Sequence, residues 1–313
     1  MDGDEGEPGW VEGLVGRVRP GVRVLGVVRR TRGPVSNVYA VRCGGPDAGL
    51  IVKVYAAQWR WKQQKEVHVY RMLARHGVGL IPEVLLQDGD GGPLGGGFTV
   101  MTLLEGRPLS EVEGGLGDTD VARIYRQIGG WLAGTHRIGQ DAYGYVTTGI
   151  IDPLPDNTAY MERQFATKLD DFGRLGGDPA LLAAMRAHVA ERSGLFAHCT
   201  GPVLCHNDIH EGNVLVGRAA DGGWDVTGFI DVENALAADP LMDLAKADYY
   251  AIRGSGGKRA AFFEGYGTLP AGLEERLALY RLFHALELWD FYAATGRPDP
   301  LPGIAEDIGR LTG

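Results

Sequence analysis

The sequence contains little cysteine: three residues among 313, with no two of them spaced as a CxxC pair. Small domains that depend on disulfides use far more cysteine, and structural zinc sites usually present paired ligands at short spacing. The count therefore excludes a disulfide-rich scaffold and argues against a zinc site. We expect Cys43, Cys199 and Cys205 to be reduced thiols, and the apolar run that contains Cys205 indicates packing in a core.

Long apolar runs and an excess of positive charge are also missing. No apolar stretch approaches the roughly 20 residues that span a bilayer. The start, MDGDEGEPGW, is acidic and glycine-rich where a signal peptide is basic and then apolar. We therefore expect a cytoplasmic protein with a frayed start. Lys and Arg number 31 against 40 Asp and Glu, a net charge of −9, which disfavours nucleic acids and membranes as partners and favours a cationic ligand wherever acidic residues cluster.

The length and the apolar content allow a substantial core. A chain of 313 residues with 44% hydrophobic content is long enough for a large domain or two lobes. The 49 glycines fall in turns and show no repeating period. Glycine therefore marks loops between ordinary secondary-structure elements.

Three short runs between residues 24 and 55 are typical of β-strands. Val24–Arg30 is rich in β-branched residues, Ser36–Arg42 alternates polar and apolar residues, and Leu50–Tyr55 is a third apolar run. Only short turns separate them, so they predict an antiparallel sheet.

Two charged residues fall where burial is expected. Lys53 lies within the apolar run LIVKVY, and a buried ammonium is costly unless an anion meets it. In the helical segment WRWKQQKEVHVYRMLARHG, Glu66 shares a face with the apolar residues three, four and seven positions later. We therefore expect Glu66 to point toward the core, where it can pair with Lys53, while the Arg and Lys residues mostly point elsewhere.

The most informative stretch is VLCHNDIHEGNVLV, residues 203–216, followed by FIDVENALAADPLMDLA, residues 229–245. Phosphoryl transfer needs one carboxylate to orient an attacking hydroxyl and accept its proton, and oxygen ligands that hold Mg²⁺ on the nucleotide phosphates. Asp208 suits the first task, and Asn213 and Asp231 suit the second. Either motif alone fits ordinary turn residues, but two linked motifs in this order favour a phosphoryl-transfer site.

These motifs resemble the catalytic loop HGDxxxxN and the metal segment IDWExAxxGDPxxDLA of the aminoglycoside phosphotransferase family, which phosphorylates antibiotics and other small molecules. The sequence departs from that pattern at Asn207, where Gly is usual, and at Val232, where an aromatic residue is usual. Neither change removes a catalytic heteroatom. The resemblance implies an α+β, two-lobed protein-kinase-like fold. Its small antiparallel-sheet lobe and hinge would span residues 1–104, and its larger, mainly helical lobe residues 105–313.

The resemblance also implies roles for residues outside the two motifs. Lys53 would contact the α- and β-phosphates with Glu66 behind it, and His206 would order the catalytic loop. The turn RTRGPVSNVYAV and the run FTVMTLLEG resemble the nucleotide loop and the hinge, with Met101 as gatekeeper. The turn would supply Ser36 and Asn37 as hydrogen-bond donors to phosphate oxygens. The hinge would supply backbone groups of Thr102, Leu103 and Leu104 that contact the purine. A plain hairpin turn at Ser36 and an outward-facing Lys53 are the alternatives.

From Thr119 onward the apolar spacing is helical, with helices expected from about 119, over 153–190 and from about 273. We expect His136 to be structural, and expect a solvated face at four charged residues: Arg163, Lys168, Asp170 and Asp171. Glu287 and Asp290 stand at i and i+3 and so share a helix flank. In relatives that modify amino sugars, acidic residues near the carboxy-terminal end of the chain bind substrate ammonium groups. Glu287 and Asp290 are therefore candidate substrate ligands, in addition to Asp208. Simple solvent exposure is the alternative.

We therefore predict a Mg²⁺-dependent O-phosphotransferase that moves the γ-phosphate of ATP or GTP to a hydroxyl of an antibiotic, in resistance or self-protection. The acceptor would be of aminoglycoside, basic peptide or nucleoside type. A metabolic kinase acting on choline, homoserine, a fructosamine or methylthioribose shares every motif. A non-catalytic pseudokinase is disfavoured because the catalytic set is complete. The acceptor, its hydroxyl and the choice of nucleotide are not readable from the sequence.

Overall fold

The computed structural model describes residues 9–32, 35–45, 49–89 and 96–313. Contacts divide the chain into two compact units. The first extends to Arg107 and also contains Leu215–Gly217 and Thr227–Glu233, and the second contains the remainder. A single cut in the sequence does not describe this division, because two later segments belong to the first unit. The expected frayed start and the Gly33–Pro34 turn lie outside the described residues.

The first unit contains a five-stranded antiparallel sheet with strand order β1-β2-β3-β5-β4. Its strands are β1 (Val24–Arg32), β2 (Ser36–Cys43), β3 (Gly49–Tyr55), β4 (Val84–Asp88) and β5 (Phe98–Thr102). The three strands expected before residue 55 are all present. Within the sheet, Lys53 lies opposite Val38 of β2 and Thr99 of β5.

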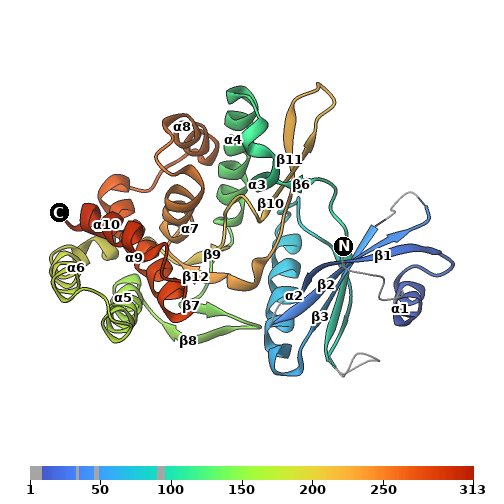
Figure 1. Cartoon of the computed structure of the whole chain (residues 1–313), viewed down its shortest axis with the longest axis horizontal. Coiled ribbons are helices and arrows are strands. Elements are labelled where there is room, and N and C mark those ends of the chain that lie inside the picture. The colour runs from blue at the N-terminus through green and yellow to red at the C-terminus, as the bar shows by residue number, and fades with distance from the viewer. Residues whose placement is uncertain (1–8, 33–34, 46–48, 90–95) are drawn as a thin grey trace. The chain divides into compact units, whose positions relative to one another are not determined.

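Helices α1 (Trp10–Val18) and α2 (Arg60–Arg75) belong to the first unit, with the short 3-10 helix η1 (Ala57–Trp59) before α2. α2 runs along the sheet and contacts β4 and β5 (Figure 1). Its predicted inner face is buried, including Glu66. Lys65 differs from expectation, because it too is buried, and burial lowers its pKa to about 7. The sequence did not predict α1, whose Val11, Leu14 and Val15 join the core of the sheet.

The second unit is mainly helical. Its helices are α3 (Leu109–Val112), η2 (Glu113–Gly115), α4 (Asp118–Thr135), α5 (Asn157–Arg174), α6 (Pro179–Arg192), η3 (Ser193–His198), α7 (Leu241–Ala247), η5 (Asp248–Ile252), α8 (Gly256–Tyr266), α9 (Leu273–Ala294) and α10 (Leu301–Thr312). α4 packs against α8, and α9 packs against α5, α7 and α10 (Figure 1). The expected helices are present, whereas α10 was not predicted. None of the helices in the described ranges is long and apolar enough to cross a membrane.

Two small sheets complete the fold. A four-stranded sheet has the order β8-β7-β12-β9, from β7 (Tyr143–Val146), β8 (Ile150–Leu154), β9 (Val203–Cys205) and β12 (Leu236–Ala238). A three-stranded sheet has the order β11-β10-β6, from β6 (Arg107–Pro108), β10 (Val214–Arg218) and β11 (Trp224–Phe229), and η4 (Val232–Asn234) follows β11. β9 leads directly into the motif at His206, and β12 lies beside it in the same sheet.

Local signals explain where the two helices of the 153–190 segment begin. The side chain of Asp156 accepts a hydrogen bond from the Ala159 N–H at 2.8 Å and so caps α5. Asp178 caps α6 in the same way through the Leu181 N–H at 2.7 Å, with Pro179 at the first helical position. These caps set the first residues of α5 and α6, and α5 contributes side chains to a cavity of the second unit.

Candidate active site

A cluster of opposite charges surrounds Lys53 in the first unit. Its Nζ lies 3.0 Å from Glu66 Oε1, 3.6 Å from Asp231 Oδ1 and 3.6 Å from Glu233 Oε2. Lys53 is 8% exposed, so the outward-facing alternative is wrong. Burial alone lowers the pKa of Lys53, but the surrounding carboxylates outweigh it and hold the pKa above the usual value. Lys53 is therefore kept as an ammonium.

Glu66 is held between two donors. It is 2% exposed, and Lys53 donates to its Oε1 while the Tyr55 hydroxyl donates to its Oε2. The pairing of Lys53 with Glu66 that the helix face predicted is therefore present. Both oxygens of this buried carboxylate are satisfied, as a buried charge requires.

Asp231 reaches the cluster from a strained backbone. Its φ is +65°, in the left-handed region, and its N–H donates to the Tyr70 hydroxyl at 3.1 Å. Asp231 Oδ1 is a buried atom that accepts no hydrogen bond from the part of the chain the structure describes. Glu233, to which the sequence assigned no role, lies 3.1 Å from Lys62 Nζ as well as near Lys53. Its place in the motif was the only signal that pointed to it.

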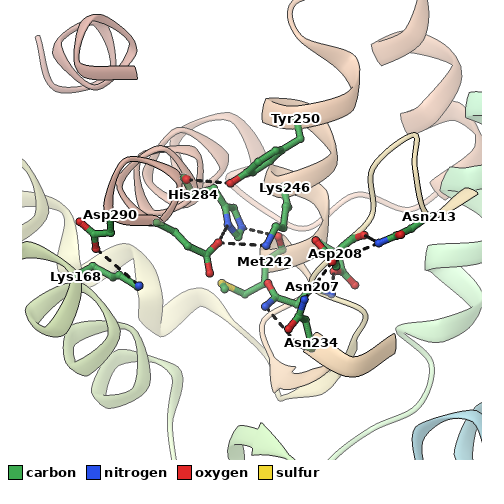
Figure 2. Close-up of polar contacts among 12 residues, drawn as sticks. Lys168, Asn207, Asp208, Asn213, Asn234, Met242, Lys246, Tyr250, His284 and Asp290 are labelled. Carbon is green, nitrogen blue, oxygen red and sulfur yellow. Dashed lines mark hydrogen bonds and ion pairs between the residues drawn. The ribbon is translucent and has the colours of Figure 1, made fainter. Parts of the chain in front are cut away.

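Asp208 lies in the second unit among neutral amides (Figure 2). Asn213 Nδ2 donates to the Asp208 carbonyl at 2.9 Å and lies 3.3 Å from Asp208 Oδ2. Asn234 Nδ2 donates to the same Oδ2 at 3.1 Å. Two amides thus orient one carboxylate oxygen, and Oδ1 receives no hydrogen bond from the described residues. Asn234 occupies a variable position of the motif, so no sequence signal pointed to it.

The loop that carries Asp208 is anchored by Asp243. The N–H groups of His206 and Asn207 donate to the two Asp243 oxygens at 2.7 and 2.6 Å, and His136 Nε2 lies 3.0 Å from Oδ2. Burial alone raises the pKa of Asp243, but the hydrogen bonds outweigh it and lower the pKa. This contact of His136 is consistent with the structural role expected for it, which stays a prediction.

Asn207 stands where the family pattern has glycine. Its backbone is left-handed, with φ +58°, which is a conformation that favours glycine. Glycine adopts this region freely, and asparagine tolerates it better than most residues. His206 is 2% exposed and packs edge-on against Trp131, with ring centroids 5.9 Å apart. This packing is consistent with the ordering role predicted for His206, which stays a prediction.

Apart from Glu66 on α2, the candidate residues of the nucleotide site lie on the sheet or directly after β5. Ser36 and Asn37 open β2 and are half-buried. Thr102 and Leu103 line a cavity of about 860 Å³ in the first unit. Their N–H groups already donate to Glu83 and Gly49 carbonyls, at 3.0 and 3.2 Å. Within the described residues the Leu104 N–H has no such partner, so Leu104 is the better candidate for a donor to the purine.

The two acidic residues of α9 have different surroundings. Glu287 is half-buried, lines a cavity in the second unit and lies 3.2 Å from Lys246 Nζ. Asp290 is 4% exposed, and its Oδ2 lies 3.8 Å from Lys168 Nζ. Simple solvent exposure is therefore wrong for Asp290. Of the four residues expected on a solvated face, Arg163 and Asp170 are exposed, while Lys168 and Asp171 are half-buried. Lys168 and Arg163 also line the same cavity as Glu287.

The donor chemistry of two predicted Mg²⁺ ligands fits a hard cation. Asp231 offers a buried oxygen that accepts no hydrogen bond from any residue in the described ranges. Asn213 directs its amide nitrogen at Asp208, which leaves its amide oxygen as an acceptor. Carboxylate and amide oxygens are the ligand types that Mg²⁺ prefers.

Comparisons with known proteins bear on the family and on the fold. The model of the phosphotransferase enzyme family matches residues 27–280, and a search of curated proteins found no match. The apo form of a thermostable mutant of aminoglycoside phosphotransferase APH(4)-Ia is 18% identical, with a TM-score of 0.69 over 92% of this chain and 94% of that chain. Its ternary complex with ADP and hygromycin B is 17% identical, with a TM-score of 0.72 over 96% and 97% of the two chains.

A third solved structure extends the likeness. The GDP and kanamycin complex of APH(2")-IIia is 14% identical, with a TM-score of 0.68 over 96% of this chain and 97% of that chain. At such low identities these structures show the fold, which is the α+β protein-kinase-like fold expected from the motifs. Since the family model covers most of the sequence, the chain belongs to the phosphotransferase enzyme family that includes the aminoglycoside phosphotransferases.

Proposed function

We propose that this protein transfers the γ-phosphate of ATP or GTP to a hydroxyl group of a small molecule. The observation that carries the proposal is the state of Asp208. Two amides hold its Oδ2, while Oδ1 receives no hydrogen bond from the described residues. A carboxylate held in this way can accept the proton of an attacking hydroxyl.

In the proposed reaction Asp208 orients the acceptor hydroxyl and takes its proton. A bond forms between the acceptor oxygen and the γ-phosphorus, the bond from that phosphorus to the β–γ bridging oxygen breaks, and the nucleoside diphosphate leaves. Lys53, kept charged by Glu66, contacts the α- and β-phosphates. Ser36 and Asn37 supply further hydrogen-bond donors to phosphate oxygens. The hinge contacts the purine through Thr102, Leu103 and Leu104. His206 orders the catalytic loop.

Asn213 and Asp231 are the proposed ligands of Mg²⁺. When bound, the metal ion would neutralise charge on the phosphate oxygens. Removal of divalent cations with EDTA should abolish phosphoryl transfer, and added Mg²⁺ should restore it. Transfer that continues in EDTA would exclude this assignment.

For the acceptor we propose a class of compound and no single molecule. The neighbouring structures include complexes with hygromycin B and with kanamycin, which supports an antibiotic as acceptor and a role in resistance or self-protection. A metabolic alcohol remains the second candidate, because every motif is shared. Of the two acidic residues of α9 proposed as acceptor ligands, Glu287 lines a cavity beside the Asp208 loop, whereas Asp290 is not among the residues that line it. A cytoplasmic location stays a prediction.

The test is a phosphorylation screen of antibiotics and metabolic alcohols with ATP and with GTP, read by mass spectrometry as a mass increase of one phosphate. The catalytic loop is tested in parallel with Asp208→Asn, which keeps the size of the side chain. We expect at least one acceptor to be phosphorylated by the wild-type protein and not by that variant. Phosphorylation of no compound, or equal activity in both proteins, would overturn the proposed function.

A further inference from the structure

A cavity of about 350 Å³ opens beside the Asp208 loop within the second unit. Asn207, the neighbour of Asp208, lines it, and so does Asn234, whose amide holds the Asp208 carboxylate. Figure 2 shows Asn207 and Asn234 next to Asp208. The cavity is in the size range of pockets for small ligands. If the proposed function holds, this cavity receives the acceptor.

Cations outnumber anions along the lining. Helix α5 contributes Arg163 and Lys168, and α7 contributes Lys246, whereas Asp152 and Glu287 are the lining carboxylates among the described residues. A pocket for a polycation is expected to show the opposite balance, because each substrate ammonium needs a carboxylate or other acceptor. The overall charge of −9 is therefore not reflected at this cavity.

Glu287 is already paired with cations of the protein itself. Lys246 Nζ and His284 Nδ1 each lie 3.2 Å from its Oε2. Burial alone raises the pKa of Glu287, but Lys246 and His284 outweigh it and hold the pKa well below the usual range. A substrate ammonium would have to compete with the ammonium of Lys246, a residue that is 8% exposed. The carboxylate therefore serves chiefly to keep Lys246 in place.

The two cations of α5 are less fully neutralised. Lys168 Nζ lies 3.8 Å from Asp290 Oδ2, beyond a normal hydrogen bond, and burial raises the pKa of Asp290 to about 7. Arg163 is exposed and donates from Nη2 to the Asp152 carbonyl at 3.2 Å, a neutral acceptor. A guanidinium has five N–H donors in a planar fork that matches carboxylate and phosphate oxygens. Arg163 and Lys168 can therefore bind an anion without breaking an internal ion pair of similar strength.

We propose that the acceptor carries an anionic group, a carboxylate or a phosphate, in addition to the hydroxyl that is phosphorylated, and that Arg163 and Lys168 bind this group. The proposal rests on the proposed function and narrows its substrate class. It places a hydroxy acid or a phosphorylated alcohol ahead of a polycationic amino sugar.

The first test compares acceptors that share one skeleton and differ in charge. One trio is glucuronate, glucose and glucosamine, and the library contains similar trios of hydroxy acids, amides and amines, with phosphorylated alcohols as a separate arm. In any trio that is phosphorylated, we expect kcat/KM for the anionic member to exceed the others by at least about tenfold. Preference for the neutral or the cationic member would overturn the proposal.

Variants of the two cations test the assignment itself. The double variant Arg163→Gln with Lys168→Gln should lower kcat/KM for the anionic acceptor by at least about tenfold and change the neutral acceptor by less than about threefold. Arg174→Gln is the matched control, because Arg174 lies on the same helix and pairs with Asp171 outside the cavity. Equal losses for both acceptors, or losses in the control, would contradict the proposal.

A second test needs no acceptor. Met242 lines the cavity, so a carbon-13 methyl label on methionine, assigned with Met242→Leu, reports binding there. Acetate and inorganic phosphate should each shift this resonance in a saturable way, and the double variant should abolish the shift. A shift with spermidine and none with either anion would overturn the proposal. Failure of the proposed function looks different, because then no compound is phosphorylated although the Met242 resonance still responds to anions.

Discussion

The Lys53 cluster of the first unit and the Asp208 loop of the second unit hold their charged groups by different means. Lys53 has three carboxylates within 3.6 Å, and one of them also pairs with Lys62. Asp208 instead receives hydrogen bonds from the neutral amides of Asn213 and Asn234. Opposite charges in a buried cluster fix the protonation state of their partners, whereas amides fix the orientation of a carboxylate and leave its charge uncompensated.

The difference matches the tasks proposed for the two regions. A lysine that contacts phosphates has to remain an ammonium, and it also compensates a buried glutamate. A carboxylate that accepts a proton has to keep its basicity, which a neighbouring ammonium would reduce. Changes in the Lys53 cluster should therefore affect folding stability and nucleotide affinity, while changes around Asp208 should affect kcat.

The largest expected effect is on catalysis at Asp208. Asp208→Ala should lower kcat by about two to four orders of magnitude and leave nucleotide affinity near that of the wild type, because the lost group acts on the acceptor proton. Steady-state kinetics and nucleotide titration measure the two quantities. Asp170→Ala, an exposed carboxylate of α5, is the control. Full activity in Asp208→Ala would show that Asp208 does not accept the acceptor proton, so the difference between the two regions would not reflect their proposed tasks.

At the Lys53 cluster, Lys53→Met should lower the free energy of unfolding by about 3 kcal/mol, because Glu66 is left as a buried, uncompensated charge. The double variant Lys53→Met with Glu66→Gln should regain most of that stability, since both charges are gone, without regaining nucleotide affinity. Urea unfolding and calorimetric titration distinguish the two. If the single variant is as stable as the double variant, the pair does not compensate charge as inferred.

A smaller effect is expected at Asn234. Asn234→Ala removes one of the two amides on Asp208 Oδ2, so kcat should fall by about tenfold while KM for the nucleotide changes by less than about twofold. Gln140→Ala, a surface amide that donates to the Gly139 carbonyl, is the control. A change in nucleotide KM with kcat intact would show that Asn234 does not act by positioning Asp208.

The last expected effect concerns Asp290 and pH. Burial raises the pKa of Asp290 to about 7 in the folded protein. The folded state therefore binds this proton more tightly than the unfolded chain does, which stabilises the fold at low pH. This stabilisation is lost as pH rises from about 4 to 7. Asp290→Asn should therefore match the wild type near pH 4 and be more stable than the wild type at pH 8. Thermal unfolding at both values is the measurement. A variant that is less stable at pH 8 would show that the pair with Lys168 stabilises the fold.

Much of the fold follows from patterns that are local in the sequence. The alternation in Ser36–Arg42 and the helical spacing around Glu66 depend on side-chain periods of about two and 3.6 residues, so β2, α2 and the burial of Glu66 could be predicted. The two linked motifs likewise placed Asp208, Asn213 and Asp231 among the candidates. α1, β4 and α10 were not predicted. β4 is only five residues long and its burial does not alternate, whereas α1 and α10 do carry an apolar face at helical spacing, so periodicity could have found these two helices.

The partners of the charged groups were decided only by the tertiary structure. Composition and helix spacing placed Glu287 and Asp290 on one flank of a helix, but they could not show that α7 brings Lys246 to Glu287 and that α5 brings Lys168 near Asp290. The contact between Asn234 and Asp208 joins residues 26 positions apart. A charge acts through what lies within a few ångströms of it, and the neighbours from other elements are set by packing, not by spacing along the chain.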